Sequence, residues 1–161
     1  MANIRFKGLE EYEKKLSKLG QASERIAGAA LYEGAKIMAD AIKSNIQSLP
    51  IVRGYGTEEK PLPGGVTSAQ KQGLINGFGI SSMQKDNGYY TVKRGFDGYN
   101  KTKTKAYPQG QPNQLVARGV ESGTSWKQKY PFVRPAVNKS RKATEKRMEE
   151  ILDREIEKLM K

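Results

Sequence analysis

The first apolar pattern along the chain predicts a short amphipathic helix near the N-terminus. Leu9, Tyr12, Leu16 and Leu19 recur at spacings of three and four residues, which places their side chains on one helix face. Gly20 follows directly and is expected to end this helix, because glycine readily adopts the left-handed conformation of a C-terminal cap.

A second apolar stripe predicts a long helix from about Ser23 to about Leu49. Small residues crowd the remaining positions and would let a neighbouring helix or sheet approach closely. Pro50 is expected to end the helix, because the residue before a proline disfavours the helical conformation. The stripe consists of Ala27, Leu31, Ala35, Met38, Ile42, Ile46 and Leu49.

The middle of the chain is predicted to hold two long loops. Residues 51–73 contain many turn-forming Gly and Pro residues, and residues 97–113 are largely polar. A loop of more than about 12 residues inside a compact domain is usually functional or disordered. We therefore expect both loops to be mobile in the isolated protein and to become ordered when partners bind.

Extended segments are predicted on both sides of Asn87-Gly88. An Asn-Gly pair between two extended runs is a strong hairpin signal, because both turn residues need positive φ. The first run begins near Gly73, and the return strand covers residues 89–96, which are rich in β-branched and aromatic side chains. Residues 3–6 predict a further short strand, and residues 114–121 fit either a strand or a helical turn.

The last apolar pattern predicts an amphipathic helix with Pro135 in its first turn, which continues nearly to the C-terminus. Its polar face mixes basic and acidic residues at spacings that favour ion pairs. The whole chain, residues 1–161, is therefore predicted to be a single α+β domain with long helices packed on a small antiparallel sheet. The predicted stripe is Ala136, Lys139, Ala143, Arg147, Met148, Ile151, Leu152, Ile156 and Leu159.

The composition excludes much of the common enzyme chemistry. The 161 residues include no Cys and no His, so disulfides, thiolate nucleophiles, Ser–His–Asp triads and His-based metal sites are all excluded. Adjacent acidic pairs such as Glu149 and Glu150 do not face each other on a helix. We therefore predict that the protein is not an enzyme and has no catalytic residues, no metal ligands and no cofactor.

The formal net charge of +12 favours anionic partners, such as nucleic acid or an acidic protein surface. No apolar run approaches the ~20 residues of a membrane span, so we expect a soluble intracellular protein without membrane contact. Lys101, Lys103 and Lys105 form a candidate basic loop that could face an acidic partner or DNA. A solvated mobile loop without a partner explains the same residues.

A group of aromatic and basic residues forms the predicted partner interface. Trp and Tyr are enriched at protein interfaces, and an aromatic ring beside Lys can also stack on a base or on a neighbouring ring. The structural alternatives are an ordinary half-buried Trp in a loop, and a Phe that anchors the entry to the last helix between two prolines. The candidate interface residues are Trp126, Tyr130, Phe132, Arg134, Tyr89 and Tyr107.

Five segments, in their order along the chain, carry a resemblance to a known family. They are Gly8-Leu9 at the opening of the first helix, the Ala-rich helix 31–49, Gly73-Leu-Ile-Asn-Gly77, Val120-Glu-Ser-Gly-Thr124, and Pro131-Phe-Val-Arg-Pro-Ala136. The last, followed by a charged helix, is the most specific. The chain resembles the head–tail joining, or tail-completion, proteins of long-tailed bacteriophages and prophages along its full length. The stretch 97–113 departs from the compact pattern of that family.

The resemblance implies a structural protein of the virion neck or tail top. Such proteins form rings, often hexamers, between the capsid connector and the tail. The implied partners are further copies of the chain and the neighbouring connector and tail proteins, with DNA only in passage or in weak non-specific contact. The implied location is the cytoplasm of the bacterial host during assembly and then the virion. The alternative is a basic nucleic-acid-binding protein, or a small His-free toxin that acts on RNA.

Overall fold

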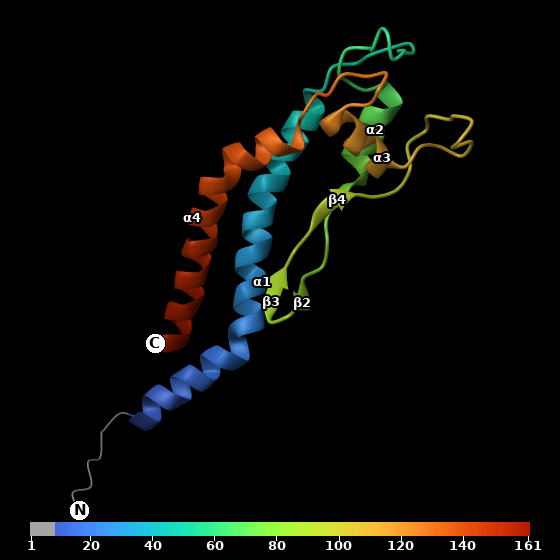
Figure 1. Ribbon diagram of the computed structural model, residues 1–161. Helices are drawn as coiled ribbons and strands as arrows, with labels where there is room; N and C mark the ends of the chain where they lie inside the picture. The colour runs from blue at the N-terminus through green and yellow to red at the C-terminus, as the bar shows by residue number, and fades with distance from the viewer. Residues whose placement is uncertain (1–8) are drawn as a thin grey trace, which may run out of the picture.

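A stem of two long helices forms most of the length of the molecule. The computed structural model describes residues 9–161, so the strand predicted for residues 3–6 lies outside the described residues. Helix α1 (Leu9–Gln47) and helix α4 (Val133–Met160) pack side by side in opposite directions, and α1 extends beyond the C-terminal end of α4 (Figure 1). Two short helices and the long loops gather at the other end of the stem, which we call the head, and a β arm runs from there along the stem. The predicted α+β class is confirmed.

Helix α1 is continuous, so the prediction of two helices separated near Gly20 is wrong. Glycine costs a helix interior only about 1 kcal/mol relative to alanine, and the helix-forming residues on both sides outweigh this penalty. Gly20 does not have the positive φ of a C-terminal cap, and its carbonyl oxygen accepts a hydrogen bond from Ser23 Oγ at 2.8 Å. At the other end the prediction is confirmed, because α1 ends at Gln47, shortly before Pro50.

The two stem helices approach closely because α1 presents small side chains to α4. A Cβ atom placed on Gly34 would lie 2.6 Å from Met148 Cγ and 3.2 Å from Thr144 Cγ2. The expectation that small residues would let another helix pack against this one is therefore confirmed.

The buried face of α4 differs from the predicted stripe. Lys139 and Ala143 are exposed, whereas Ser140 and Thr144 are buried beside Ile151. Small polar side chains fit the narrow space opposite the small residues of α1, and Ser140 Oγ satisfies itself by donating to the Ala136 carbonyl oxygen at 2.7 Å. The apolar periodicity could not predict this face, because three of the five buried residues of α4 are polar.

A buried acidic side chain joins the two stem helices near the C-terminal end of α4. Glu155 is 8% exposed and accepts hydrogen bonds from Arg25 of α1 and Lys158 of α4, both at 2.9 Å. The hydrogen bonds from Lys158 and then Arg25 lower the pKa of the Glu155 carboxyl to about 2, against the opposing effect of burial. Glu155 is therefore a charged link between helices rather than a free acid.

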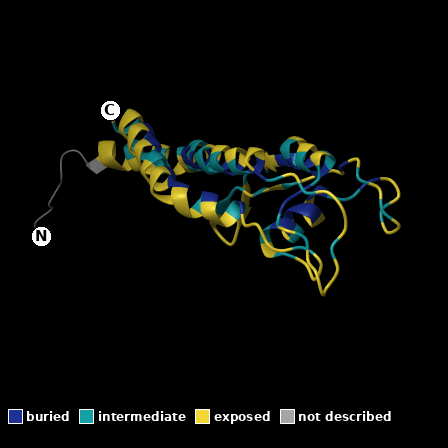
Figure 2. Cartoon of the chain, turned by 90° about the horizontal axis from the view of Figure 1, so that it is seen from above, coloured by how far each residue is buried: buried dark blue, intermediate teal, exposed yellow. Residues whose placement is uncertain are grey.

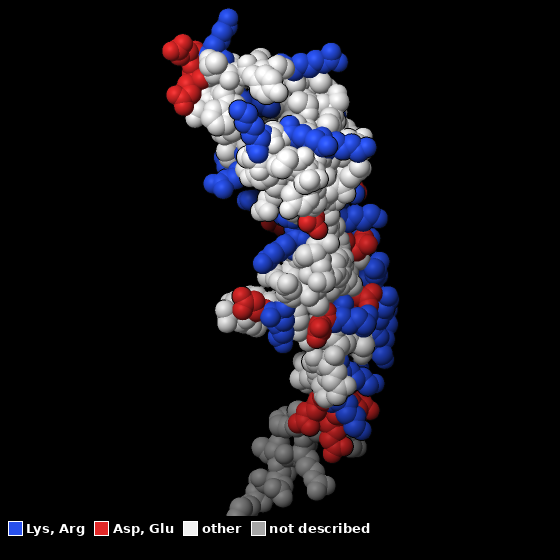
Figure 3. All heavy atoms as spheres, turned by 90° about the vertical axis from the view of Figure 1, so that its right-hand side faces the viewer, with Lys and Arg blue, Asp and Glu red and all other residues white. Residues whose placement is uncertain are grey.

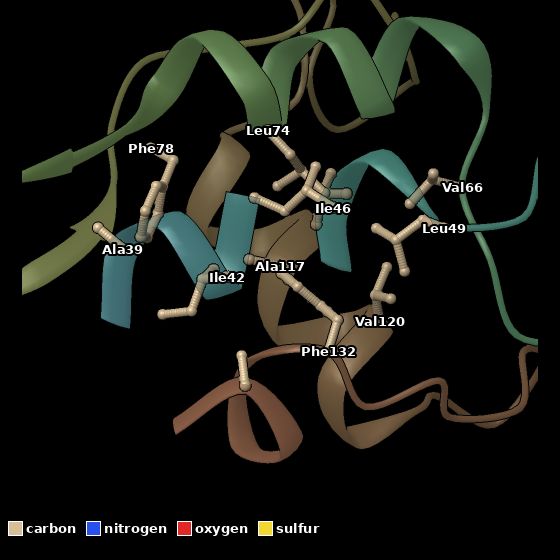
Figure 4. Packing of buried hydrophobic residues seen from close by; sticks show 12 residues of the cluster. Ala39, Ile42, Ile46, Leu49, Val66, Leu74, Phe78, Ala117, Val120 and Phe132 are labelled. Atoms are coloured by element: carbon tan, nitrogen blue, oxygen red, sulfur yellow. The ribbon is translucent and has the colours of Figure 1, made fainter. Parts of the chain in front are cut away.

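The hydrophobic core lies in the head, where the upper end of α1 meets two short helices and the start of α4. Figure 4 shows the buried side chains converging from these elements. Phe78, Phe96 and Phe132 form a chain of aromatic contacts, with ring centroids 5.1 and 5.9 Å apart. The largest fully buried side chains of this core are Phe132, Ile42, Ile46, Leu49, Leu74 and Val66, and Ile151 is equally buried in the stem.

Helix α2 (Ser68–Gly77) occupies part of a segment that the sequence predicted to be loop and strand, so that prediction is wrong for residues 68–77. The helix begins with a capping box, in which Thr67 Oγ1 accepts from the Gln70 backbone N–H and Gln70 Oε1 accepts from the Thr67 backbone N–H. The spacing of these two residues is a sequence signal for a helix start. Leu74, fully buried, then fixes α2 against the core.

Helix α3 (Asn113–Ser122) resolves the choice left open for residues 114–121 in favour of a helix. Its inner face places Val116, Ala117 and Val120 against the core, with exposures of 7% or less. The predicted loop 97–113 therefore ends where α3 begins.

A long β arm, residues 78–96, connects the head to the side of the stem. Strands β1 (Phe78–Ile80) and β4 (Arg94–Phe96) pair antiparallel, and so do β2 (Gln84–Asp86) and β3 (Tyr89–Thr91). The hairpin prediction is confirmed, because Asn87 and Gly88 have φ values of 49° and 82°. The predicted return strand is interrupted between β3 and β4. Each sheet has two strands among the described residues, so every strand has one unpaired edge.

Candidate partner-binding surface of the head

Two loops cover the end of the head and project away from the stem, and most of their residues are exposed (Figure 2). We call them the first head loop, residues 50–67, and the second head loop, residues 98–112. The first loop pairs with residues 126–128, because the Leu62 N–H donates to the Trp126 carbonyl oxygen at 2.9 Å and Gln128 N–H donates to the Leu62 carbonyl oxygen at 2.8 Å. The mobility of the two head loops in the isolated protein remains a prediction.

The base of the second head loop is held by buried asparagines. Asn113 Nδ2 donates to the Asp97 carbonyl oxygen at 2.8 Å, and Asn100 Nδ2 donates to the Gln111 carbonyl oxygen at 3.0 Å. Asn100 Oδ1 also accepts from the Thr102 N–H at 2.8 Å. These bonds connect the two ends of the loop, so its exposed part starts from a fixed base.

A groove lies between the two head loops and α3. It consists of two hollows of about 510 and 540 Å³, which have Gln70, Gln111, Trp126 and Lys127 in common. We call the combined surface the head groove. Gln70 and Gln111 are 41 residues apart in sequence, and Gln70 Nε2 donates to Gln111 Oε1 at 2.8 Å.

Every charged side chain that lines the head groove is basic. Arg118 lines one hollow, Lys103 lines the other, and Lys127 lines both. Lys127 Nζ donates to the Gly65 carbonyl oxygen at 3.2 Å and has no carboxylate partner within residues 9–161. Partial burial lowers the pKa of Lys127 from its ordinary value. The groove therefore contains a partly desolvated amine that an anion would stabilise in its charged form.

The predicted basic loop is only partly in this groove. Lys103 lines it, whereas Lys101 and Lys105 are exposed on the same loop outside its lining. Tyr107 is half-buried, and its backbone exchanges two hydrogen bonds of 3.1 Å with Thr104. Tyr107 therefore closes a turn in the loop. Figure 3 shows Lys and Arg side chains standing out from the head, with one acidic cluster at its top.

The predicted aromatic interface residues do not form one surface. Trp126 is 55% exposed and lines the head groove, whereas Tyr89 is 75% exposed at the turn of the β arm, away from the head loops (Figure 1). Tyr130 is exposed beside the first head loop, and Arg134 is exposed at the start of α4. Phe132 is 1% exposed and belongs to the core, so its prediction as an interface residue is wrong and the anchoring alternative is confirmed. Its position between α1, α3 and β4 favours complete burial.

Two of the segments that carry the family resemblance, residues 120–124 and residues 131–136, are joined by one carboxylate. Glu121, at the end of α3, accepts three backbone N–H groups from the first residues of α4. Its Oε2 atom accepts from Phe132 and Val133 at 2.8 and 2.9 Å, and its Oε1 atom accepts from Arg134 at 2.9 Å. These are N–H groups that a helix start leaves without intrahelical partners. The Val-Glu segment thus caps the helix that the Pro-Phe segment begins.

A second exposed surface lies on the part of α1 that extends beyond α4. Tyr12 and Leu16 are 55% and 46% exposed, although they lie on the apolar face of the helix. No described element covers this face. Apolar side chains aligned in this way are typical of a helix that packs against a further chain.

Comparison with known proteins finds no matching family model, no matching curated protein and no matching solved structure. Among the described helices, none combines the length and apolar character that crossing a membrane requires.

Proposed function

We propose that this chain is a structural subunit of a ring at the head–tail interface of a long-tailed bacteriophage. The proposed role needs neither a reaction nor a cofactor. Its support is the sequence resemblance together with the arrangement of the described elements: a long stem, a β arm that lies against α1, and a head with exposed loops.

The β arm is the observation that carries the proposal. A hairpin of two strands is at best marginally stable in water. All three residues of β2 are exposed, and one edge of this strand has no partner strand among the described residues. Such an edge pairs readily with a strand of another chain. If the arm of one copy contacts a different surface of the next copy, repetition of the contact closes a ring.

The cap formed by Glu121 gives further support. Of the segments that carry the family resemblance, the two nearest the C-terminus contact each other through Glu121 and the start of α4. Their co-occurrence in sequence therefore has a physical reason, since each needs the other to begin the last helix.

A phage with a stop codon in this gene tests the proposal. In a host that does not suppress the stop codon, we expect separate filled heads and tails by electron microscopy, and joined particles when the protein is supplied from a plasmid. Joined, infectious particles that lack the protein would refute the proposed role.

The second candidate function is binding of nucleic acid, which the three exposed lysines of the second head loop favour. Neutralising phosphates with lysine releases counterions, so binding to random duplex DNA would weaken steeply as salt is raised. Tight binding of such DNA at physiological salt would favour this function over an assembly role.

A further inference from the structure

The head groove combines an apolar wall with unpaired positive charge. Val116 and Val120 lie in the wall with Leu115, which is 44% exposed, and Trp126 stands at the junction of the two hollows. An exposed Leu beside an exposed Trp leaves apolar surface that a ligand side chain could cover.

The positive charge of the groove lacks a counterpart within the described residues. Arg118, Lys103 and Lys127 line the hollows, and no acidic residue does. Lys127 is the most informative, because it is partly withdrawn from water and contacts a carbonyl oxygen rather than a carboxylate. A carboxylate brought to Lys127 would offset this loss of hydration.

Amide groups in the groove offer a further contact. Gln70 Nε2 donates a hydrogen bond to Gln111 Oε1. The amide nitrogen of Gln111 therefore keeps two hydrogens to donate to a ligand. A peptide carbonyl or a carboxylate would accept them. Apolar surface, cations and an amide donor are the contacts that an extended polypeptide with acidic and apolar side chains would need.

We propose that the head groove binds an extended segment of a partner protein in which acidic side chains alternate with apolar ones. A carboxylate of the segment pairs with Lys127, and an apolar side chain packs on Leu115 and Trp126. This inference rests on the proposed function in taking the partner to be a protein of the assembly, and it adds the chemical character of the segment that the subunit captures.

A protein segment fits the groove better than a nucleic acid strand. Binding a strand needs a succession of cations along its phosphates, whereas Lys101 and Lys105 lie outside the lining and three cations are distributed over two hollows. Among the lining residues, Leu115 offers an exposed aliphatic side chain, and the exposed aromatic rings are Trp126 and Tyr55 rather than a continuous row for stacking.

The single tryptophan of the chain makes the test specific to the groove. Trp126 is the one Trp among 161 residues, so its fluorescence reports this surface directly. The full-length protein is titrated with a short synthetic peptide in which glutamate alternates with leucine. We expect saturable quenching or a blue shift of the emission, as the peptide buries the indole. A peptide with lysine in place of glutamate should give no change.

Charge-neutralising variants identify the site. Lys127→Gln should weaken peptide binding about tenfold, the loss expected for one hydrogen-bonded charge pair. Arg118→Gln and Lys103→Gln, at the more exposed positions, should weaken it less. Lys142→Gln, which removes the same charge from an exposed position on α4, is the matched control and should leave binding unchanged. If Lys127→Gln does not fold, as judged by circular dichroism, Arg118→Gln and Lys103→Gln decide the question.

Three results would overturn the inference. They are an unchanged Trp126 emission with the acidic peptide, equal binding by the groove variants and the Lys142→Gln control, and tighter binding of a thymidine oligonucleotide than of the peptide at the same salt concentration. The proposed function fails separately, since joined particles without the protein would refute it whatever the peptide does. A phage with Lys127→Gln that assembles normally, while the purified variant has lost the peptide, would show that the groove is not used in joining.

Discussion

Replacement of Glu121 by alanine is the most direct test of how the last helix begins. The substitution removes the acceptor of three backbone N–H groups, those of Phe132, Val133 and Arg134. Removing a helix N-cap costs about 0.5–2 kcal/mol, and a hydrogen bond to a charged group contributes about 1.5–3 kcal/mol. Part of the loss is recovered, because water can reach the exposed Arg134 N–H. We therefore expect the free energy of unfolding to fall by about 2–3 kcal/mol.

This loss should be visible in thermal and urea unfolding followed by far-UV circular dichroism. A chain of this length shifts its Tm by about 2–4 °C for each kcal/mol, so we expect a decrease of about 5–10 °C. Glu121→Gln keeps an acceptor oxygen, so its Tm should lie between those of the parent protein and Glu121→Ala. Glu145→Ala removes a carboxylate from an exposed position of α4 and serves as the control, with a change within about 0.5 kcal/mol. If Glu121→Ala changes stability no more than Glu145→Ala does, the capping role of Glu121 is refuted.

Three further predictions concern other parts of the fold. The lowered pKa of Glu155 stabilises the folded state above the ordinary carboxyl pKa of 4.5, and this stabilisation is lost as pH falls towards about 2. Glu155→Gln should therefore lower Tm near neutral pH and flatten its decline between those pH values; an unchanged pH profile would contradict the ion-pair assignment. Gly34→Val should destabilise the stem by about 1–3 kcal/mol through overpacking, whereas Gly20→Ala, in open space on the same helix, should be neutral or stabilising by up to about 1 kcal/mol in urea titrations. Thr67→Ala should cost about 1 kcal/mol through loss of the capping box, and equal urea midpoints for variant and parent would refute that role.

Local chemistry explains why several elements could be predicted from the sequence. The hairpin follows from the positive φ that Asn87 and Gly88 tolerate, and the end of α1 follows from the restriction that Pro50 places on the preceding residue. Pro135 lies in the first turn of α4, where its missing N–H costs nothing. The capping box at Thr67 was an equally local signal for α2, and it would have corrected the prediction of a loop through residue 73.

The head groove could be recognised only in the tertiary structure. The pattern could select Trp126 and Lys103 as candidates, because aromatic and basic residues in loops are typical of interfaces. It could not bring Gln70 to Gln111, or single out Lys127 from the lysines beside it, because burial and long-range contacts determine both.

Local patterns in the sequence were enough to place the C-terminal end of α1, helix α4 and the β-hairpin, since periodicity, proline restriction and turn preferences act over a few neighbouring residues. The tertiary structure alone decided which faces are covered: it placed Phe132 in the core rather than at an interface, and Ser140 rather than Ala143 in the stem. Burial depends on what packs opposite a side chain, and those partners come from distant parts of the chain.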